Sequence, residues 1–212
     1  MISRFIRRFG QRRAALQKAR GSDSQQTQAE LDLSTIIPVF DLKEGLRNDP
    51  EGGPFTPIEA SPFGVTWATQ PAPNRFVPVT HEQAAYWQDL GLDWQTAAMS
   101  NLAQATPSDQ WYQRKCDQAG KPFVLGLQTD DAFGPSRLFL PHLFDEVLGP
   151  GYRVAIPEWT CAFAYRAELN TEERFDVDGA INGCFQLGTT PMSPERFDAS
   201  TFWIFGEGAS TA

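Results

Sequence analysis

Residues 122–128 read PFVLGLQ, and residues 152–168 read YRVAIPEWTCAFAYRAE. Both stretches are rich in aromatic, β-branched and other apolar side chains, a composition typical of strands that are buried in a sheet. The second stretch is long enough for a strand pair or one bent strand. Between them, Pro141 fits the first position of a helix, where its missing backbone N–H costs no hydrogen bond, and Gly149 ends this helix. This order of elements predicts a sheet covered by helices.

Further helices and strands are expected on both sides of this region. Residues that can cap a helix predict helices over 80–90, 93–106, 108–120 and from 170 to about 187. Short apolar or β-branched stretches predict strands over 33–42, 63–70, 75–79 and 201–205. Pro38 lacks a backbone donor, which favours a sheet edge or a bulge for the first of these strands. The expected fold is α+β, a mixed sheet covered by several helices in a single compact domain.

The composition and its shifts along the chain predict where this domain begins and ends. A chain of 212 residues with 41% hydrophobic residues can bury a core without help from metals or disulfides. Residues 21–30 carry no apolar side chain larger than alanine, as expected for a flexible linker. We therefore expect a basic arm over 1–20, a linker over 21–30, the α+β domain over 31–206 and a frayed tail over 207–212.

The arm has a charge opposite to that of the rest of the chain. Residues 1–20 hold seven basic residues and no acidic one, which leaves 11 of the 18 basic residues and all 26 acidic residues for the remainder. Helical spacing separates an apolar face from a basic face, as in an amphipathic helix. The apolar face holds Ile2, Phe5, Ile6 and Phe9, and Arg4, Arg7 and Arg8 lie on the other side. These residues and Arg12 are the candidates for binding a membrane or a partner.

Such an arm is expected to bind an anionic membrane surface or a groove on a partner protein. Two other interpretations stay open: the arm folds onto its own acidic domain, or it is an organelle transit peptide, which is also arginine-rich and free of acidic residues. The folded domain is too acidic to favour nucleic acid as a partner. The oligomeric state is left open.

The three cysteines lack the spacing of a disulfide framework or a zinc site. Cys116, Cys161 and Cys184 are therefore expected to be free thiols in a reducing compartment. No run approaches the length needed to cross a bilayer, and no secretion signal is recognisable. The expected location is cytoplasmic, with a possible peripheral position at the inner face of the membrane.

No motif for phosphate binding, zinc proteolysis or acyl transfer is present, and we expect no metal and no cofactor. The histidines, His81 and His142, fall in the first turns of predicted helices, where polar surface residues are ordinary. Buried structural roles are favoured for Cys161 and Cys184 over a nucleophilic one.

Three carboxylates are the catalytic candidates. Asp130 and Asp131 follow the expected strand at 122–128, and paired carboxylates at a strand end can share a proton or bind a cation. The alternative is an acidic turn that bonds its own backbone, with Arg137 neutralising the charge.

Glu158 interrupts an apolar strand, and Trp159 beside it can stack on a ligand. A bulge at the strand end is the alternative for this pair. Arg137 and Trp159 are the ligand-binding candidates.

Three segments resemble the YtpQ-like family of uncharacterised bacterial proteins, which is defined by a domain of unknown function. The resemblance extends over about residues 76–205 and concerns packing and turns, not chemistry. The first segment has Trp87, Gly91, Leu92, Ala98, Asn101 and Leu102. The second has Asp130, Asp131, Ser136, Leu138, Leu140, Pro141, Ala155, Ile156 and Pro157. The third has Met192, Ser193, Pro194 and Phe197. Glu158 and Trp159 depart from the family pattern.

Two functions from different classes follow. The first is a non-enzymatic binding or adaptor module, with an acidic α+β domain for a protein or small ligand and a basic amphipathic tether. The alternative is an enzyme that acts on a small polar substrate through Asp130, Asp131 and Glu158. The absence of catalytic motifs favours the first.

Overall fold

The structure is a computed structural model, and it describes residues 33–46, 53–72, 75–106, 111–129 and 131–205. By their contacts, these residues form two compact units, which we call the N-terminal unit (33–106 with Phe205) and the C-terminal unit (111–204). Each unit combines an antiparallel sheet with helices, so the predicted α+β class is confirmed. The predicted arm, linker and tail lie outside the described residues, and the predicted domain extent of 31–206 stays a prediction.

The described part of the N-terminal unit is a small sheet with three α-helices and a 3-10 helix. Its elements are η3 (Leu33–Thr35), β1 (Ile36–Leu42), α3 (Lys43–Leu46), β2 (Thr56–Pro57), β3 (Phe63–Ala72), β4 (Arg75–Pro78), α4 (His81–Asp89) and α5 (Trp94–Gln104). β3 pairs with β1 on one side and with β2 and β4 on the other. β1 is thus an edge strand among the described strands, as Pro38 predicts.

Helix α5 is fixed to the start of β1 by one side chain. The Asn101 amide donates hydrogen bonds to the carbonyl oxygens of Leu33 and Ile36, both at 2.9 Å. In the core of this unit, Trp67 of β3 meets Trp94 of α5 edge to face, with ring centroids 5.0 Å apart. The packing of α5 on the sheet therefore rests on polar contacts to the start of β1 and on aromatic packing against β3.

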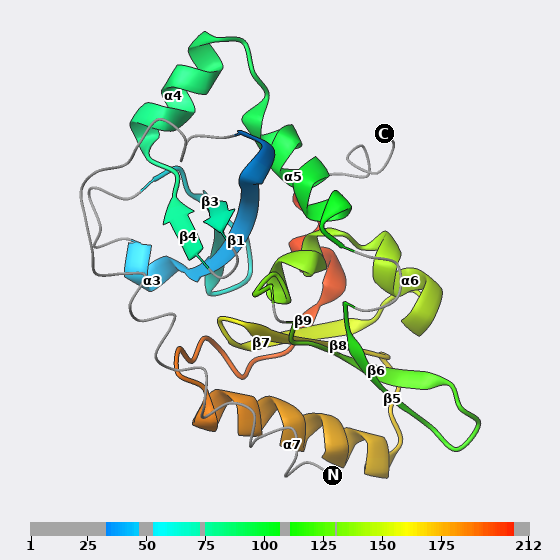
Figure 1. Cartoon of the computed structure of the whole chain (residues 1–212). Helices are drawn as coiled ribbons and strands as arrows, with labels where there is room; N and C mark the ends of the chain where they lie inside the picture. The colour runs from blue at the N-terminus through cyan, green and yellow to red at the C-terminus, as the bar shows by residue number, and fades with distance from the viewer. Residues whose placement is uncertain (1–32, 47–52, 73–74, 107–110, 130, 206–212) are drawn as a thin grey trace. The chain divides into compact units, whose positions relative to one another are not determined.

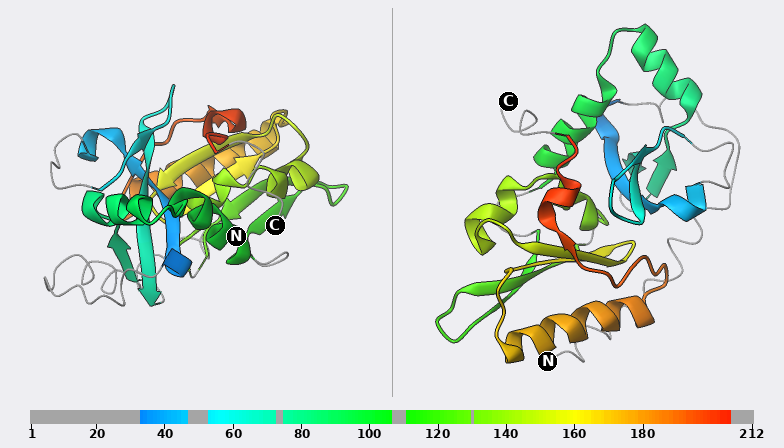
Figure 2. Two further views of the ribbon diagram at one scale, coloured as in Figure 1. Left: turned by 90° about the horizontal axis from the view of Figure 1, so that it is seen from above. Right: turned by 180° about the vertical axis from the view of Figure 1, so that it is seen from behind.

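The C-terminal unit is a five-stranded sheet in the order β5-β6-β8-β7-β9 with helices on both faces (Figure 1). Its elements are β5 (Gln113–Cys116), β6 (Pro122–Leu127), η4 (Pro135–Phe139), α6 (His142–Leu148), β7 (Arg153–Glu158), β8 (Cys161–Tyr165), α7 (Thr171–Leu187), β9 (Phe197–Asp198) and η5 (Ala199–Phe202). Helix α7 covers one face, and α6 lies on the opposite side of the sheet, as the rear view in Figure 2 also shows. The central strands β6, β8 and β7 are therefore buried along almost their whole length.

Alternation along β8 places its larger side chains against α7. Cys161, Phe163 and Tyr165 share a core cluster with Val177 and Ile181 of the helix. The intervening alanines at 162 and 164 are fully buried on the other face. This arrangement brings the end of β8 next to the first turns of α7.

Two expected elements are wrong, and both corrections have a local cause. The expected helix over 108–120 is replaced by β5 and a turn, in which the Asp117 carboxylate accepts hydrogen bonds from the backbone N–H groups of Ala119 and Lys121. Gly120 in this turn has φ +79°, a conformation that glycine adopts without strain. The expected strand over 201–205 is wrong as well, because a short strand at Phe197–Asp198 is followed by the 3-10 helix η5.

The sheets also differ from the expected mixed arrangement. All the strand pairs among the described residues are antiparallel. Short turns join β5 to β6 and β7 to β8, and such hairpin connections require antiparallel neighbours.

Candidate functional site

The predicted acidic turn after β6 is a closed network around Asp131. Its Oδ1 accepts from the Thr129 hydroxyl at 2.5 Å and from the Phe133 backbone N–H at 2.9 Å. The fully buried Arg137 donates to Oδ2 at 2.5 Å and to Oδ1 at 3.2 Å. Burial alone would raise the pKa of Asp131, but the hydrogen bonds from Arg137, Thr129 and Phe133 outweigh it and hold the pKa below its usual value. Asp130 lies outside the described residues.

Glu158 closes a second network, at the turn between β7 and β8. One carboxylate oxygen accepts from the Thr160 backbone N–H at 2.7 Å and from the Thr160 hydroxyl at 2.6 Å. The other oxygen accepts from the Thr189 hydroxyl at 3.4 Å and the Thr190 backbone N–H at 3.3 Å. The side chain is buried, so this carboxylate joins the turn to the segment after α7.

The neighbouring candidates also have contacts within the fold. Trp159 is half-buried in the same turn, and its backbone N–H donates to the Thr190 carbonyl oxygen. The register of β7 and β8 shifts between Ala155 and Glu158, as the bulge interpretation predicts. The catalytic role of Asp131 and Glu158 stays a prediction, and both carboxylates already have several donors each.

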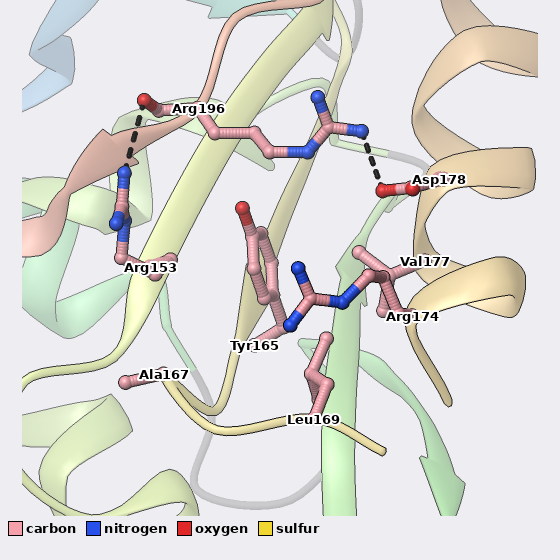
Figure 3. Close-up of a pocket in the computed structure, with 8 residues that line it drawn as sticks. All are labelled: Arg153, Tyr165, Ala167, Leu169, Arg174, Val177, Asp178 and Arg196. Atoms are coloured by element: carbon pink, nitrogen blue, oxygen red, sulfur yellow. Dashed lines mark hydrogen bonds and ion pairs between the residues drawn. The ribbon is translucent and has the colours of Figure 1, made fainter. Parts of the chain in front are cut away.

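A pocket of about 340 Å³ opens elsewhere in the C-terminal unit, between α7 and the sheet. We call it the arginine pocket, because three of its eight lining residues are arginines. The lining residues are Arg153, Tyr165, Ala167, Leu169, Arg174, Val177, Asp178 and Arg196. Figure 3 shows the ring of Tyr165 among the three guanidinium groups. None of the predicted site residues lines this pocket.

The β7–β8 hairpin supplies the first half of the pocket. Arg153 at the start of β7 pairs directly with Tyr165 at the end of β8, so both side chains leave the same face of the sheet. Arg153 also pairs with Asp198 of β9, and its Nε lies 3.2 Å from the carboxylate of that residue. Its guanidinium donates to the carbonyl oxygens of Phe197 and Arg196 at 3.2 and 3.4 Å, which fixes its orientation.

Helix α7 and the segment before β9 supply the second half. Val177 and Asp178 come three and four residues after Arg174 and therefore lie on the same side of the helix as Arg174. Asp178 accepts a hydrogen bond from Arg196 at 2.6 Å. The Arg174 side chain forms no hydrogen bond or ion pair with any residue that the structure describes. It is therefore available to a ligand.

The tyrosine in the middle of the pocket is a hydrogen-bond donor at neutral pH. Burial raises the pKa of Tyr165 above its usual value, although the positive charges of Arg196 and Arg153 oppose this shift. The protonated hydroxyl can donate to an anion, as the guanidinium groups can. The arrangement suits binding of a negatively charged group.

The arginine pocket was not predicted from the sequence, although the sequence does indicate that two of its residues face each other. A hairpin over 152–168 with a short turn already predicts that Arg153 faces Tyr165. The other two arginines, Arg174 and Arg196, come from segments whose place in the fold depends on tertiary packing. No periodicity in the sequence connects them.

Other possible functional groups are accounted for by the fold. The Cys161 and Cys184 sulfur atoms lie 3.4 Å apart as buried free thiols in the core under α7, and Cys116 is also a free thiol. His81 and His142 are exposed on their helices.

Over the described part of the chain, no group of three potential ligands is arranged to hold a metal ion. Within the same residues, no helix has the length and apolar character needed to cross a membrane.

Comparison of the chain with models of protein families, with curated proteins and with solved structures found no match. The resemblance to the YtpQ-like family stays a prediction.

Proposed function

We propose that the protein is a non-enzymatic binding or adaptor module whose ligand is an anion that enters the arginine pocket. One observation carries the proposal. The residues lining the pocket include three arginines and a single carboxylate, Asp178, in a chain whose net charge is −8. Since the charge of the chain as a whole repels anions, a local excess of positive charge marks the pocket as a site for one.

The pocket is also arranged for binding rather than for proton transfer. Arg153 and Arg196 are held by neighbouring carboxylates and carbonyl groups, so a ligand meets them largely pre-oriented. Guanidinium groups do not titrate near neutral pH, and burial keeps Tyr165 protonated. None of these groups is suited to act as a general base at neutral pH.

The second half of the proposed function is a tether formed by the arm, residues 1–20. Its support is the sequence pattern alone, in which basic and apolar residues alternate with helical spacing. In this proposal the arm attaches the acidic domain to an anionic membrane surface at the cytoplasmic face, or to a protein partner. The domain then presents the pocket to its ligand there.

Isothermal titration calorimetry of the full chain with inorganic phosphate and succinate tests the pocket. Binding of at least one anion with a dissociation constant of about 1 mM or lower is expected from a few charge-assisted hydrogen bonds. Arg174→Gln should weaken it, and Arg114→Gln should not. Arg114 is a matched control, because it is exposed and its neighbour Lys115 bonds to Asp176 of α7, so Arg114 points to the opposite face of the sheet. Equal binding by both variants would contradict the proposal.

Flotation with lipid vesicles tests the tether. The full chain and a variant that starts at Ser22 are compared on vesicles of neutral lipid with and without about one third phosphatidylserine. The full chain alone should float with the anionic vesicles. If neither floats, and pull-downs with the two chains recover the same proteins, the arm is not a tether.

A further inference from the structure

The charge and the shape of the arginine pocket indicate which class of anion it binds. Its lining residues carry three positive charges and one negative charge, that of Asp178. The carboxylate of Asp198 is near Arg153 as well, but its side chain is 73% exposed, so water screens most of its effect. A ligand with close to two negative charges therefore balances the pocket.

Among the residues that the structure describes, all three arginines keep donors without a partner. A guanidinium has five N–H donors. Arg196 uses one nitrogen on Asp178, and Arg153 uses Nε and one terminal nitrogen on carbonyl groups and Asp198. Arg174 uses none within the described structure. The hydroxyl of Tyr165 adds a donor between them (Figure 3).

These donors come from three directions, because Arg153 lies on β7, Arg174 on α7 and Arg196 on the segment before β9. A phosphate monoester has three terminal oxygen atoms arranged around one phosphorus atom and a charge of about −1.5 to −2 near neutral pH. It can accept hydrogen bonds from three directions at once. Each carboxylate of a dicarboxylic acid is flat and carries one charge, so it matches this arrangement less well.

The rest of the lining is apolar. Ala167, Leu169 and Val177 lie at the pocket together with the ring of Tyr165. A volume of about 340 Å³ is at the lower end of the range for small-molecule sites. It accommodates a head group and a short apolar body, and it does not accommodate a polymer chain.

We propose that the arginine pocket binds a small organic phosphate monoester, with the phosphate among Arg153, Arg174 and Arg196 and an apolar body against the half-buried Leu169. This inference rests on the proposed anion-binding function and adds the chemical class of the ligand. The phosphate stays intact, because no group at the pocket is positioned to activate water.

Calorimetric titrations of the full chain with phenyl phosphate, inorganic phosphate and succinate test the ligand class. Phenyl phosphate should bind about tenfold more tightly than inorganic phosphate, because its ring covers apolar surface in the pocket. Succinate should bind more weakly than phenyl phosphate. Leu169→Ala should reduce the affinity for phenyl phosphate several-fold and leave that for inorganic phosphate unchanged.

Substitution of the free arginine gives the second test. Arg174→Gln should weaken binding of phenyl phosphate about tenfold to hundredfold, as expected for the loss of a charge-assisted hydrogen bond, while Arg114→Gln leaves it unchanged. Thermal unfolding of each variant checks that it folds.

The outcomes separate the two proposals. If succinate binds as tightly as phenyl phosphate and Arg174→Gln weakens both, the pocket binds anions but the phosphate class is wrong. If phenyl phosphate binds no better than inorganic phosphate, the apolar half of the inference is wrong. If a phosphoserine peptide binds much more tightly than phenyl phosphate, the ligand is a modified protein rather than a small molecule. If none of the probes binds, the proposed function itself fails.

Discussion

Arg137 and Asp131 form an ion pair through two hydrogen bonds, with the guanidinium fully buried and the carboxylate about one third exposed. The pair joins the turn after β6 to the 3-10 helix η4. Two-point pairing of this kind fixes both side chains in one geometry, which a single contact does not achieve. The pair therefore organises the turn and neutralises the arginine that the fold has buried.

Asp131→Asn should destabilise the protein by about 3 kcal/mol, near the lower end for breaking a buried pair, because one partner of the pair, the carboxylate, is partly exposed. Urea unfolding followed by circular dichroism measures the change. Asp145→Asn is the matched control, since Asp145 is exposed and its side chain makes no hydrogen bond or ion pair with any residue that the structure describes. A loss of equal size in both variants would refute the assigned role of the pair.

The same carboxylate predicts how stability depends on pH. The pKa of Asp131 in the folded protein lies below its usual value of about 3.9. Its stabilising effect is therefore complete above about pH 5, where the unfolded chain is ionised as well, and is lost as the pH falls through the folded-state pKa. The stability difference between the native chain and Asp131→Asn should shrink between about pH 5 and pH 2. A constant difference across this range contradicts the assignment.

Glu158→Gln should cost about 1–3 kcal/mol, the range for a buried hydrogen bond that loses its acceptor. Both carboxylate oxygens accept from donors, including the backbone N–H groups of Thr160 and Thr190. A glutamine amide places an NH₂ donor against one of these N–H groups. Thermal unfolding tests this, with the exposed Glu168→Gln as control. An unchanged melting temperature for Glu158→Gln would contradict this structural role and favour a catalytic role for the carboxylate.

The predictable parts of the fold are those that depend on local sequence. Thr80 and Asn170 each form the capping box expected of them, and α4 and α7 begin at the following residue. Capping is decided within four residues, so the sequence alone contains it. The buried strands β6, β7 and β8 follow from their apolar composition in the same way.

The parts that escaped prediction depend on partners distant in the sequence. Arg114 lies in a polar segment that becomes β5 only because it pairs with β6 opposite Leu125. The arginine pocket likewise combines residues from three elements. Asp131 and Glu158 appeared as free carboxylates in the sequence because their donors, Arg137 and Thr190 among them, are identified only by the fold.

The three thiols should differ in reactivity. Cys161 and Cys184 are buried, while Cys116 is half-buried. The hydrogen bond with Cys184, burial and the negative charge of Glu158 raise the pKa of Cys161, so little of the reactive thiolate forms there. At about pH 8 the thiol reagent DTNB should modify one cysteine rapidly in the folded protein and all three in urea. Cys116→Ser should remove the rapid phase, and its persistence would show that the buried pair is accessible.

Two glycines of the C-terminal unit should respond to alanine in opposite directions. A Cβ added to Gly134 would lie 2.0 Å from the Leu127 carbonyl oxygen and 3.2 Å from that of Thr160. The residue has φ −42°, which alanine tolerates, so the obstacle is steric contact with the Leu127 backbone at the end of β6 and, less closely, with the β7–β8 turn. Gly183 lies inside α7 with no atom within 4 Å of an added Cβ.

Gly134→Ala should therefore destabilise the protein by about 1–3 kcal/mol or more, as overpacking against rigid backbone does. Gly183→Ala should stabilise it by about 0.5–1 kcal/mol, because alanine loses less backbone entropy in a helix. Urea unfolding of the two variants side by side gives both signs in one experiment. If Gly134→Ala is neutral while Gly183→Ala stabilises, the backbone at Gly134 does not pack as closely against the Leu127 carbonyl group as the structure shows.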